Sequence, residues 1–131
     1  MDVSVSFEGF KPEGNAPIYT QIVEYVKRGI VSGAIPDGEE LPSRRMLSAL
    51  LGVNPNTVQK ACRILEEEGI LVSHAGSKSF VTYDGRKLAE LNAELVVAGA
   101  TAAALKLKNM GISLEEAIRL IRRAWGEDDK R

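Results

Sequence analysis

The stretch that decides the fold is ELPSRRMLSALLGVNPNTVQKACRILEEEGILVSHAGSKSFV, residues 40–81. It divides into a short helical segment that begins after Ser43 and ends by Gly52, a turn, a longer helical segment, and two β-prone runs. Helix, turn, helix and hairpin in this order predict a winged helix-turn-helix. The second helix has a polar outer face suited to a DNA groove, which favours a sequence-specific DNA-binding regulator over an enzyme.

The longer helical segment, residues 55–68, has clear signals at its start and along its faces. Asn54 can cap the first turn, and Pro55 suits the first helical position. At 100° per residue the apolar residues fall on one side: Val58, Ala61, Cys62 and Leu65. The polar residues fall on the opposite side: Asn56, Gln59, Lys60, Arg63 and Glu67. This pattern predicts a helix with one buried face and one solvent-facing face.

Residues 1–39 add a lead-in and one more helix. Apolar and polar residues alternate from Val3 to Phe7, so a short strand is expected there. Pro17 suits the first position of a helix that continues at helical spacing to Gly33. The two arms of the hairpin are expected at residues 70–72 and 80–83.

Residues 84–131 read as a helical appendage. Gly111 separates two helices, and Ser113 with Glu116 forms a capping box for the second. Two short helices with an apolar stripe cannot make a good core of their own, so the stripe should be buried on the winged domain, on a partner or on both. We predict a symmetric homodimer. The residues assigned to dimerisation are Leu91, Leu95, Ala98, Ala102, Leu105, Leu114, Ile118, Ile121 and Trp125.

The predicted fold is therefore α+β, with a winged helix-turn-helix DNA-binding domain over residues 1–83 and a two-helix dimerisation appendage over residues 84–131. The charge balance gives no general basic signal. The net charge of the whole chain is −1, and residues 1–83 hold 8 Lys and Arg against 10 Asp and Glu, a balance of −2. DNA binding must then come from local clustering of cations, and we expect modest non-specific affinity.

Composition predicts a cytoplasmic protein. The start of the chain lacks the basic and long apolar regions of a signal peptide, and the weakly polar stretch at residues 95–105 is short of the ~20 residues that span a bilayer. A single cysteine, Cys62, excludes an internal disulfide and fits a reducing compartment. We expect no membrane partner, metal or cofactor.

Residues 10–83 resemble the GntR family of bacterial transcription regulators. Four of the matching motifs are Pro17-Ile18-Tyr19-x-Gln21-Ile22, Leu41-Pro42-Ser43-x-Arg45, Asn56-Thr57-Val58 and Leu65-Glu66-x-Glu68-Gly69. The short helical tail is similar to that of the YtrA subfamily, whose members typically dimerise through C-terminal helices and often repress operons for ABC transporters. Much of the wider family has Arg at the positions of Pro55 and Gln59, so base readout here should differ.

Several residues are candidates for DNA contact. The amides of Asn56 and Gln59 can pair with adenine, and Thr57 can contact a phosphate or a thymine methyl. Arg45 matches the family's DNA-contacting arginine, whereas Arg44 has no such match and is either a DNA contact or a solvated side chain. The full set is Ser43, Arg44, Arg45, Asn56, Thr57, Gln59, Lys60, Arg63 and, in the wing, Gly76 and Lys78.

Other interpretations stay open. Cys62 is either a redox switch or an inert buried thiol, and His74 has too few companions to build a metal site. The chain could instead be a winged-helix module for protein–protein contact, or a regulator with a small-molecule effector site at the dimer interface. The sequence does not indicate the operator, the regulated genes or the sign of regulation.

Overall fold

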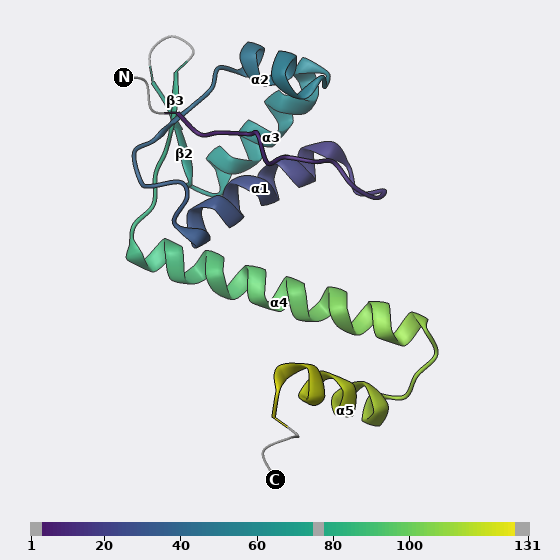
Figure 1. Ribbon diagram of the computed structural model, residues 1–131. Coiled ribbons are helices and arrows are strands. Elements are labelled where there is room, and N and C mark those ends of the chain that lie inside the picture. Colours follow the sequence, from purple (N-terminus) through teal and green to yellow (C-terminus); the bar gives the residue numbers. More distant parts are fainter. Residues whose placement is uncertain (1–3, 75–77, 128–131) are drawn as a thin grey trace. The chain divides into compact units, whose positions relative to one another are not determined.

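The computed structural model describes residues 4–74 and 78–127 (Figure 1). The elements in chain order are α1 (Ile18–Ser32), β1 (Glu40–Leu41), α2 (Arg44–Leu51), α3 (Pro55–Glu67), β2 (Leu71–Ser73), β3 (Ser79–Val81), α4 (Gly85–Asn109) and α5 (Leu114–Trp125). The chain forms two compact units, one that ends at Asn92 and one that begins at Ala93. The first unit is a winged helix-turn-helix, so the α+β fold class is confirmed.

The ends of α2 and α3 follow from the side chains that cap them. Ser43 Oγ accepts a hydrogen bond from the backbone N–H of Met46 at 3.1 Å, and Asn54 Oδ1 accepts one from Asn56 at 2.7 Å. Gly52 ends α2 in the left-handed conformation, with φ of 67°. In α1, Pro17 lies at the N-cap rather than at the expected first helical position.

The sheet has three strands in the order β1-β3-β2, all antiparallel. β1 was not predicted, and it pairs Glu40 with Phe80 and Leu41 with Ser79. The expected N-terminal strand is reduced to one parallel bridge between Ser4 and Glu40, where Val5 N–H donates to the Glu40 carbonyl at 2.9 Å. The lead-in therefore continues the sheet edge without forming a strand of its own.

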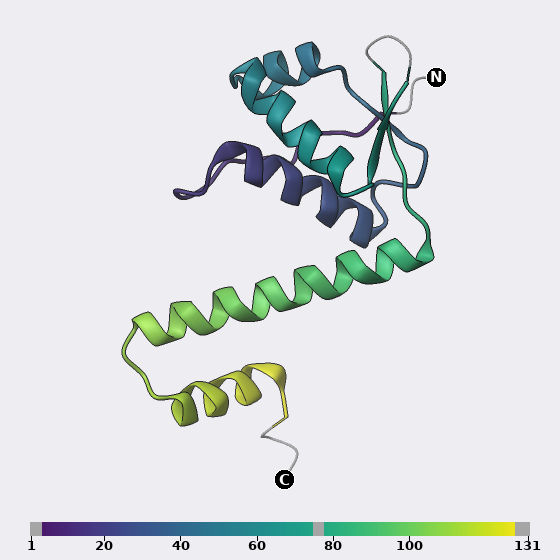
Figure 2. The same ribbon diagram turned by 180° about the vertical axis from the view of Figure 1, so that it is seen from behind.

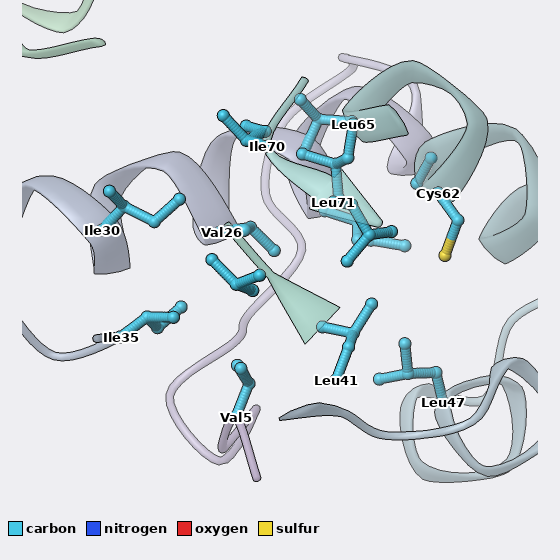
Figure 3. Close-up of a cluster of buried hydrophobic side chains, with 14 of the residues drawn as sticks. Val5, Val26, Ile30, Ile35, Leu41, Leu47, Cys62, Leu65, Ile70 and Leu71 are labelled. Carbon is cyan, nitrogen blue, oxygen red and sulfur yellow. The ribbon is translucent and has the colours of Figure 1, made fainter. Parts of the chain in front are cut away.

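The core of the first unit lies between the helices and the sheet (Figure 3). The apolar side of α3 is buried as predicted, through Val58, Ala61, Cys62 and Leu65. α1 and α3 lie side by side in both views (Figures 1 and 2). A buried lysine, Lys27 of α1, forms an ion pair of 2.7 Å with Glu68 at the end of α3. Packing and this ion pair together hold α3 in a fixed place on α1.

One residue assigned to dimerisation belongs to this core instead. Leu91 lies in the first turns of α4, is 2% exposed and joins the core of the first unit. A side chain already buried within its own chain has no surface left for a partner, so the assignment of Leu91 to a dimer interface is wrong. Helical periodicity identified an apolar face but could not tell which neighbour covers it.

The second unit, by contrast, leaves most of its apolar side chains exposed. Within its described residues α5 has no buried side chain, although Ser113 caps it by accepting a hydrogen bond from Glu116 N–H at 3.1 Å. Leu114 is 71% exposed and Trp125 is 78% exposed. A groove of about 370 Å³ lies between the end of α4 and α5, with Leu107, Ile118 and Ile121 among its lining residues.

α4 has 25 residues, more than the apolar stretch at residues 95–105 suggested, and by length and composition alone it could cross a membrane. One such helix is a weak indication, because a helix that packs against other helices passes the same test. Glu90 and Glu94 also lie in the apolar part of the helix, where a bilayer would disfavour their charge.

Candidate nucleic-acid interface

The polar side of α3 faces solvent. Asn56, Lys60 and Arg63 are exposed, while Thr57 and Gln59 are half-buried. Because the opposite face of the helix is fixed in the core, these side chains are presented from a rigid base. The structure therefore brings the five residues that were predicted on α3 onto one surface.

A groove of about 560 Å³ runs between α2 and α3. Its lining residues are Arg44, Arg45, Ser48, Ala49, Pro55, Asn56 and Gln59. Arg45 is exposed, so a guanidinium cation lies along the same groove as the amides of Asn56 and Gln59. Cations bind phosphates and amides read base edges, so this groove combines the two kinds of group that a DNA contact needs.

Arg44 differs from its neighbour Arg45. Its Nη2 lies 3.2 Å from Glu66 Oε2, and its Nε is buried without a hydrogen-bond partner among the described residues. The adjacent Cys62 side chain raises the pKa of Arg44 above its ordinary value, against the effect of burial, and Glu66 adds to the rise. Arg44 thus has an intrachain partner, while still lining the groove.

Glu66 connects three elements of the first unit. From α3, its Oε2 accepts hydrogen bonds from Arg44 of α2 and from the hydroxyl of Ser73 of β2. Ser73 Oγ in turn lies 3.4 Å from Ser79 Oγ of β3. This polar network joins α2, α3 and both arms of the hairpin. Sequence reasoning missed it, because the partners are far apart in the chain and have no common period.

Lys60 also has an intrachain neighbour that the sequence did not reveal. Its ammonium nitrogen lies 4.1 Å from the centroid of the Tyr19 ring, in the first turn of α1. This distance is typical of a cation–π interaction. The contact leaves the positive charge of Lys60 in place on the surface of α3.

The hairpin forms the wing, drawn as paired arrows beside the helices in Figure 1. His74 N–H donates to the Lys78 carbonyl at 2.9 Å, and the His74 ring meets the Phe80 ring edge-on at 5.0 Å. Lys78 is exposed, whereas Gly76 lies outside the described residues. Among the described residues there is no cluster of three or more His, Cys, Asp or Glu side chains that could hold a metal ion.

Cys62 lies on the inner side of α3, among the side chains drawn in Figure 3. Burial raises the pKa of its thiol, although the nearby Arg44 acts in the opposite direction. A buried neutral thiol is a poor nucleophile, because thiolates carry out thiol chemistry. The geometry favours the inert interpretation of Cys62 over the redox switch.

Known proteins share this arrangement. Residues 18–81 match the model of the bacterial regulatory proteins of the gntR family. The chain is 36% identical over 75 residues to the HTH-type transcriptional repressor YtrA of Bacillus subtilis. This alignment covers 57% of this chain and 58% of that relative. The alignment therefore spans little more than half of the relative's length.

Two solved structures extend the likeness. A GntR family transcriptional regulator from Listeria monocytogenes superposes with a TM-score of 0.70 and 31% identity, covering 86% of this chain and 98% of that one. YtrA from Sulfolobus acidocaldarius, a GntR-family transcription factor, gives a TM-score of 0.52 and 33% identity, covering 66% of this chain and 92% of that one. The family match at residues 18–81 includes all of α2 and α3, and hence the groove between them.

Proposed function

The chain belongs to the GntR family of DNA-binding transcriptional regulators, and we propose that it acts as a homodimeric repressor that binds a two-fold symmetric operator. The observation that carries this proposal is the groove between α2 and α3, where Arg45 lies along the same surface as Asn56 and Gln59. In this proposal α3 enters the major groove of double-stranded DNA, and Arg45 contacts a phosphate at its edge.

Each contact has its own role. Asn56 and Gln59 read base edges, and adenine is the base that an amide matches best. Thr57 contacts a phosphate or a thymine methyl, Lys60 and Arg63 contact phosphates, and Lys78 of the wing adds a cation on the flanking DNA. Ser43 acts through its cap on α2, the helix that carries Arg45. Arg44 contributes mainly to the fold, since Glu66 already binds its guanidinium.

Dimerisation is proposed from the second unit. Most apolar side chains of α4 and α5 beyond Leu91 are exposed in a single chain, and a second copy would cover them. The interface would use Leu95, Ala98, Ala102, Leu105, Leu114, Ile118, Ile121 and Trp125. Two α3 helices then read two half-sites about 34 Å apart, one turn of DNA.

Repression and a cytoplasmic location complete the proposal. The relative from Bacillus subtilis carries the name of a repressor, and a dimer bound over an operator blocks polymerase. A DNA-binding regulator works where the DNA is, and the free thiol of Cys62 suits a reducing compartment.

Two other functions are less well supported. A module for protein–protein contact needs apolar anchors on α3, whereas its outer face carries amides and cations. A small-molecule effector would have the apolar groove of about 370 Å³ in the second unit as its site, which the proposed partner helix would also occupy. A thermal-shift screen with metabolites tests for the effector, since a ligand that binds the folded state raises the melting temperature.

The proposal is tested by selecting random duplex DNA with the wild-type protein and with the variants Arg45→Ala and Gln59→Ala. We expect a two-fold palindrome that Arg45→Ala binds weakly and Gln59→Ala reads with relaxed sequence preference. Arg86→Ala is the matched control, because its side chain is 88% exposed and does not line the groove. No enrichment at low salt, where phosphate contacts are strongest, would refute the DNA-binding proposal.

A further inference from the structure

The contact between Lys60 and Tyr19 joins the recognition helix to the first turn of α1. Lys60 is exposed on the polar side of α3. Tyr19 is half-buried and packs against the core of the first unit. The ammonium nitrogen is 4.1 Å from the ring centroid. A flexible lysine side chain is therefore held by a ring that is itself fixed by packing.

No other group near Lys60 on α3 explains this orientation. Lysine on a helix is usually ordered by a carboxylate three or four residues away. Here those positions hold Asn56, Thr57, Arg63 and Ile64, none of them acidic. An aromatic face attracts the cation without neutralising it, whereas a carboxylate would cancel the charge that a phosphate needs.

We propose that Tyr19 is a positioning residue for DNA binding, whose ring holds the Lys60 ammonium at the edge of α3 for contact with a backbone phosphate. This inference rests on the proposed DNA-binding function. It extends the working surface from α2 and α3 onto α1, and it identifies the ligand group as a phosphate of duplex DNA. The role of the ring is to reduce the freedom of the lysine before DNA arrives.

Tyr19→Phe and Tyr19→Leu form a matched pair. Among the described residues the Tyr19 hydroxyl has no hydrogen-bond partner, so Phe keeps the contact that matters and Leu removes it. We expect Tyr19→Phe to bind the selected duplex like the wild type, and Tyr19→Leu to bind it about two- to five-fold more weakly for each of the two bound chains, the range of an exposed cation–π contact.

A double-mutant cycle with Lys60→Met isolates the coupling, with affinities measured by fluorescence anisotropy at several salt concentrations. Lys60→Met should reduce the slope of log affinity against log salt by about 1.8 for the proposed dimer, because each of its two chains loses one phosphate contact. Adding Tyr19→Leu to Lys60→Met should then cost nothing more. Thermal unfolding of each variant reports its stability, and Tyr19→Met replaces Tyr19→Leu if the latter unfolds.

Two outcomes would overturn the inference. An equal loss from Tyr19→Leu with and without Lys60 would mean that the ring only supports the fold. Tighter binding by Tyr19→Leu would mean that the ring withholds the lysine from DNA. Arg45→Ala separates the role of Tyr19 from DNA binding itself: if it weakens binding while the cycle shows no coupling, the role of Tyr19 fails and DNA binding stands. If the wild type selects no duplex, both fail.

Discussion

Leu65 in α3 and Leu114 in α5 occupy the apolar sides of two amphipathic helices, yet Leu65 is 1% exposed and Leu114 is 71% exposed. The first lies in a core that the first unit completes from its own residues, with α1, the sheet and Leu91 around it. Leu114 has no such core around it, and no described side chain of α5 is buried. The same sequence pattern thus has two outcomes: one helix buries its apolar side in its own chain, and the other leaves it exposed, where we propose that a partner packs.

The largest effect should come from removing a core side chain. Leu65→Ala should lower the free energy of unfolding by about 2–5 kcal/mol, because it leaves a cavity in a close-packed core. Leu114→Ala should leave the unfolding of the first unit almost unchanged and weaken self-association instead. Urea unfolding and concentration-dependent light scattering measure the two effects. Equal destabilisation by both variants would remove the contrast between the units.

A chain shortened to end at Asn92 tests whether the first unit is independent. It keeps Leu91, so we expect it to fold cooperatively and to stay monomeric. Its affinity for the selected palindrome should fall about 100-fold or more, because the two half-sites are then bound by separate molecules. Circular dichroism checks the fold and anisotropy the affinity. A shortened chain that binds the palindrome as tightly as the full chain would contradict the role of the second unit.

Arg44 and Arg45 allow the comparison to be made within a single turn of helix. Arg45→Ala should weaken DNA binding about ten-fold without changing stability, since the side chain is exposed. Arg44→Ala should lower stability by about 1 kcal/mol, through loss of its partly exposed bond to Glu66. Anisotropy and urea unfolding of both variants separate the effects. The reverse pattern would show that Arg44 is the DNA contact.

Much of the winged unit could be predicted because its signals are local. Ser43 and Asn54 cap the helices that follow them, and the apolar period of α3 places Val58 and Leu65 in the core. β1 escaped prediction because two residues are too short to show any period. Leu91 was misassigned for a different reason: its apolar character gave no sign of which surface would bury it.

The candidate site likewise has residues that could be predicted from the sequence and contacts that could not. Asn56, Gln59 and Arg45 were predicted from residue type, family resemblance and helix face, and the structure places them around one groove. The bond from Arg44 to Glu66 and the contact of Lys60 with Tyr19 were not predicted. Each joins residues from different elements, and only the packing of α1, α2 and α3 brings them together.

The smallest effect is expected at Cys62. Its buried thiol with a raised pKa should react with thiol reagents much more slowly than the thiol of the unfolded chain at pH 7–8. Oxidant should leave both DNA affinity and the thiol count unchanged. Timed labelling in native buffer and in urea gives the comparison, and a loss of DNA affinity on oxidation would restore the redox interpretation.

In the proposed function, the second unit pairs two winged units for DNA binding. The most direct test is the molar mass by size-exclusion chromatography with light scattering at micromolar concentration, for the wild type and for Ile118→Asp. We expect twice the 14.2 kDa mass of one chain for the wild-type dimer and a folded monomer for Ile118→Asp. A wild type that is monomeric at this concentration would contradict the proposed pairing.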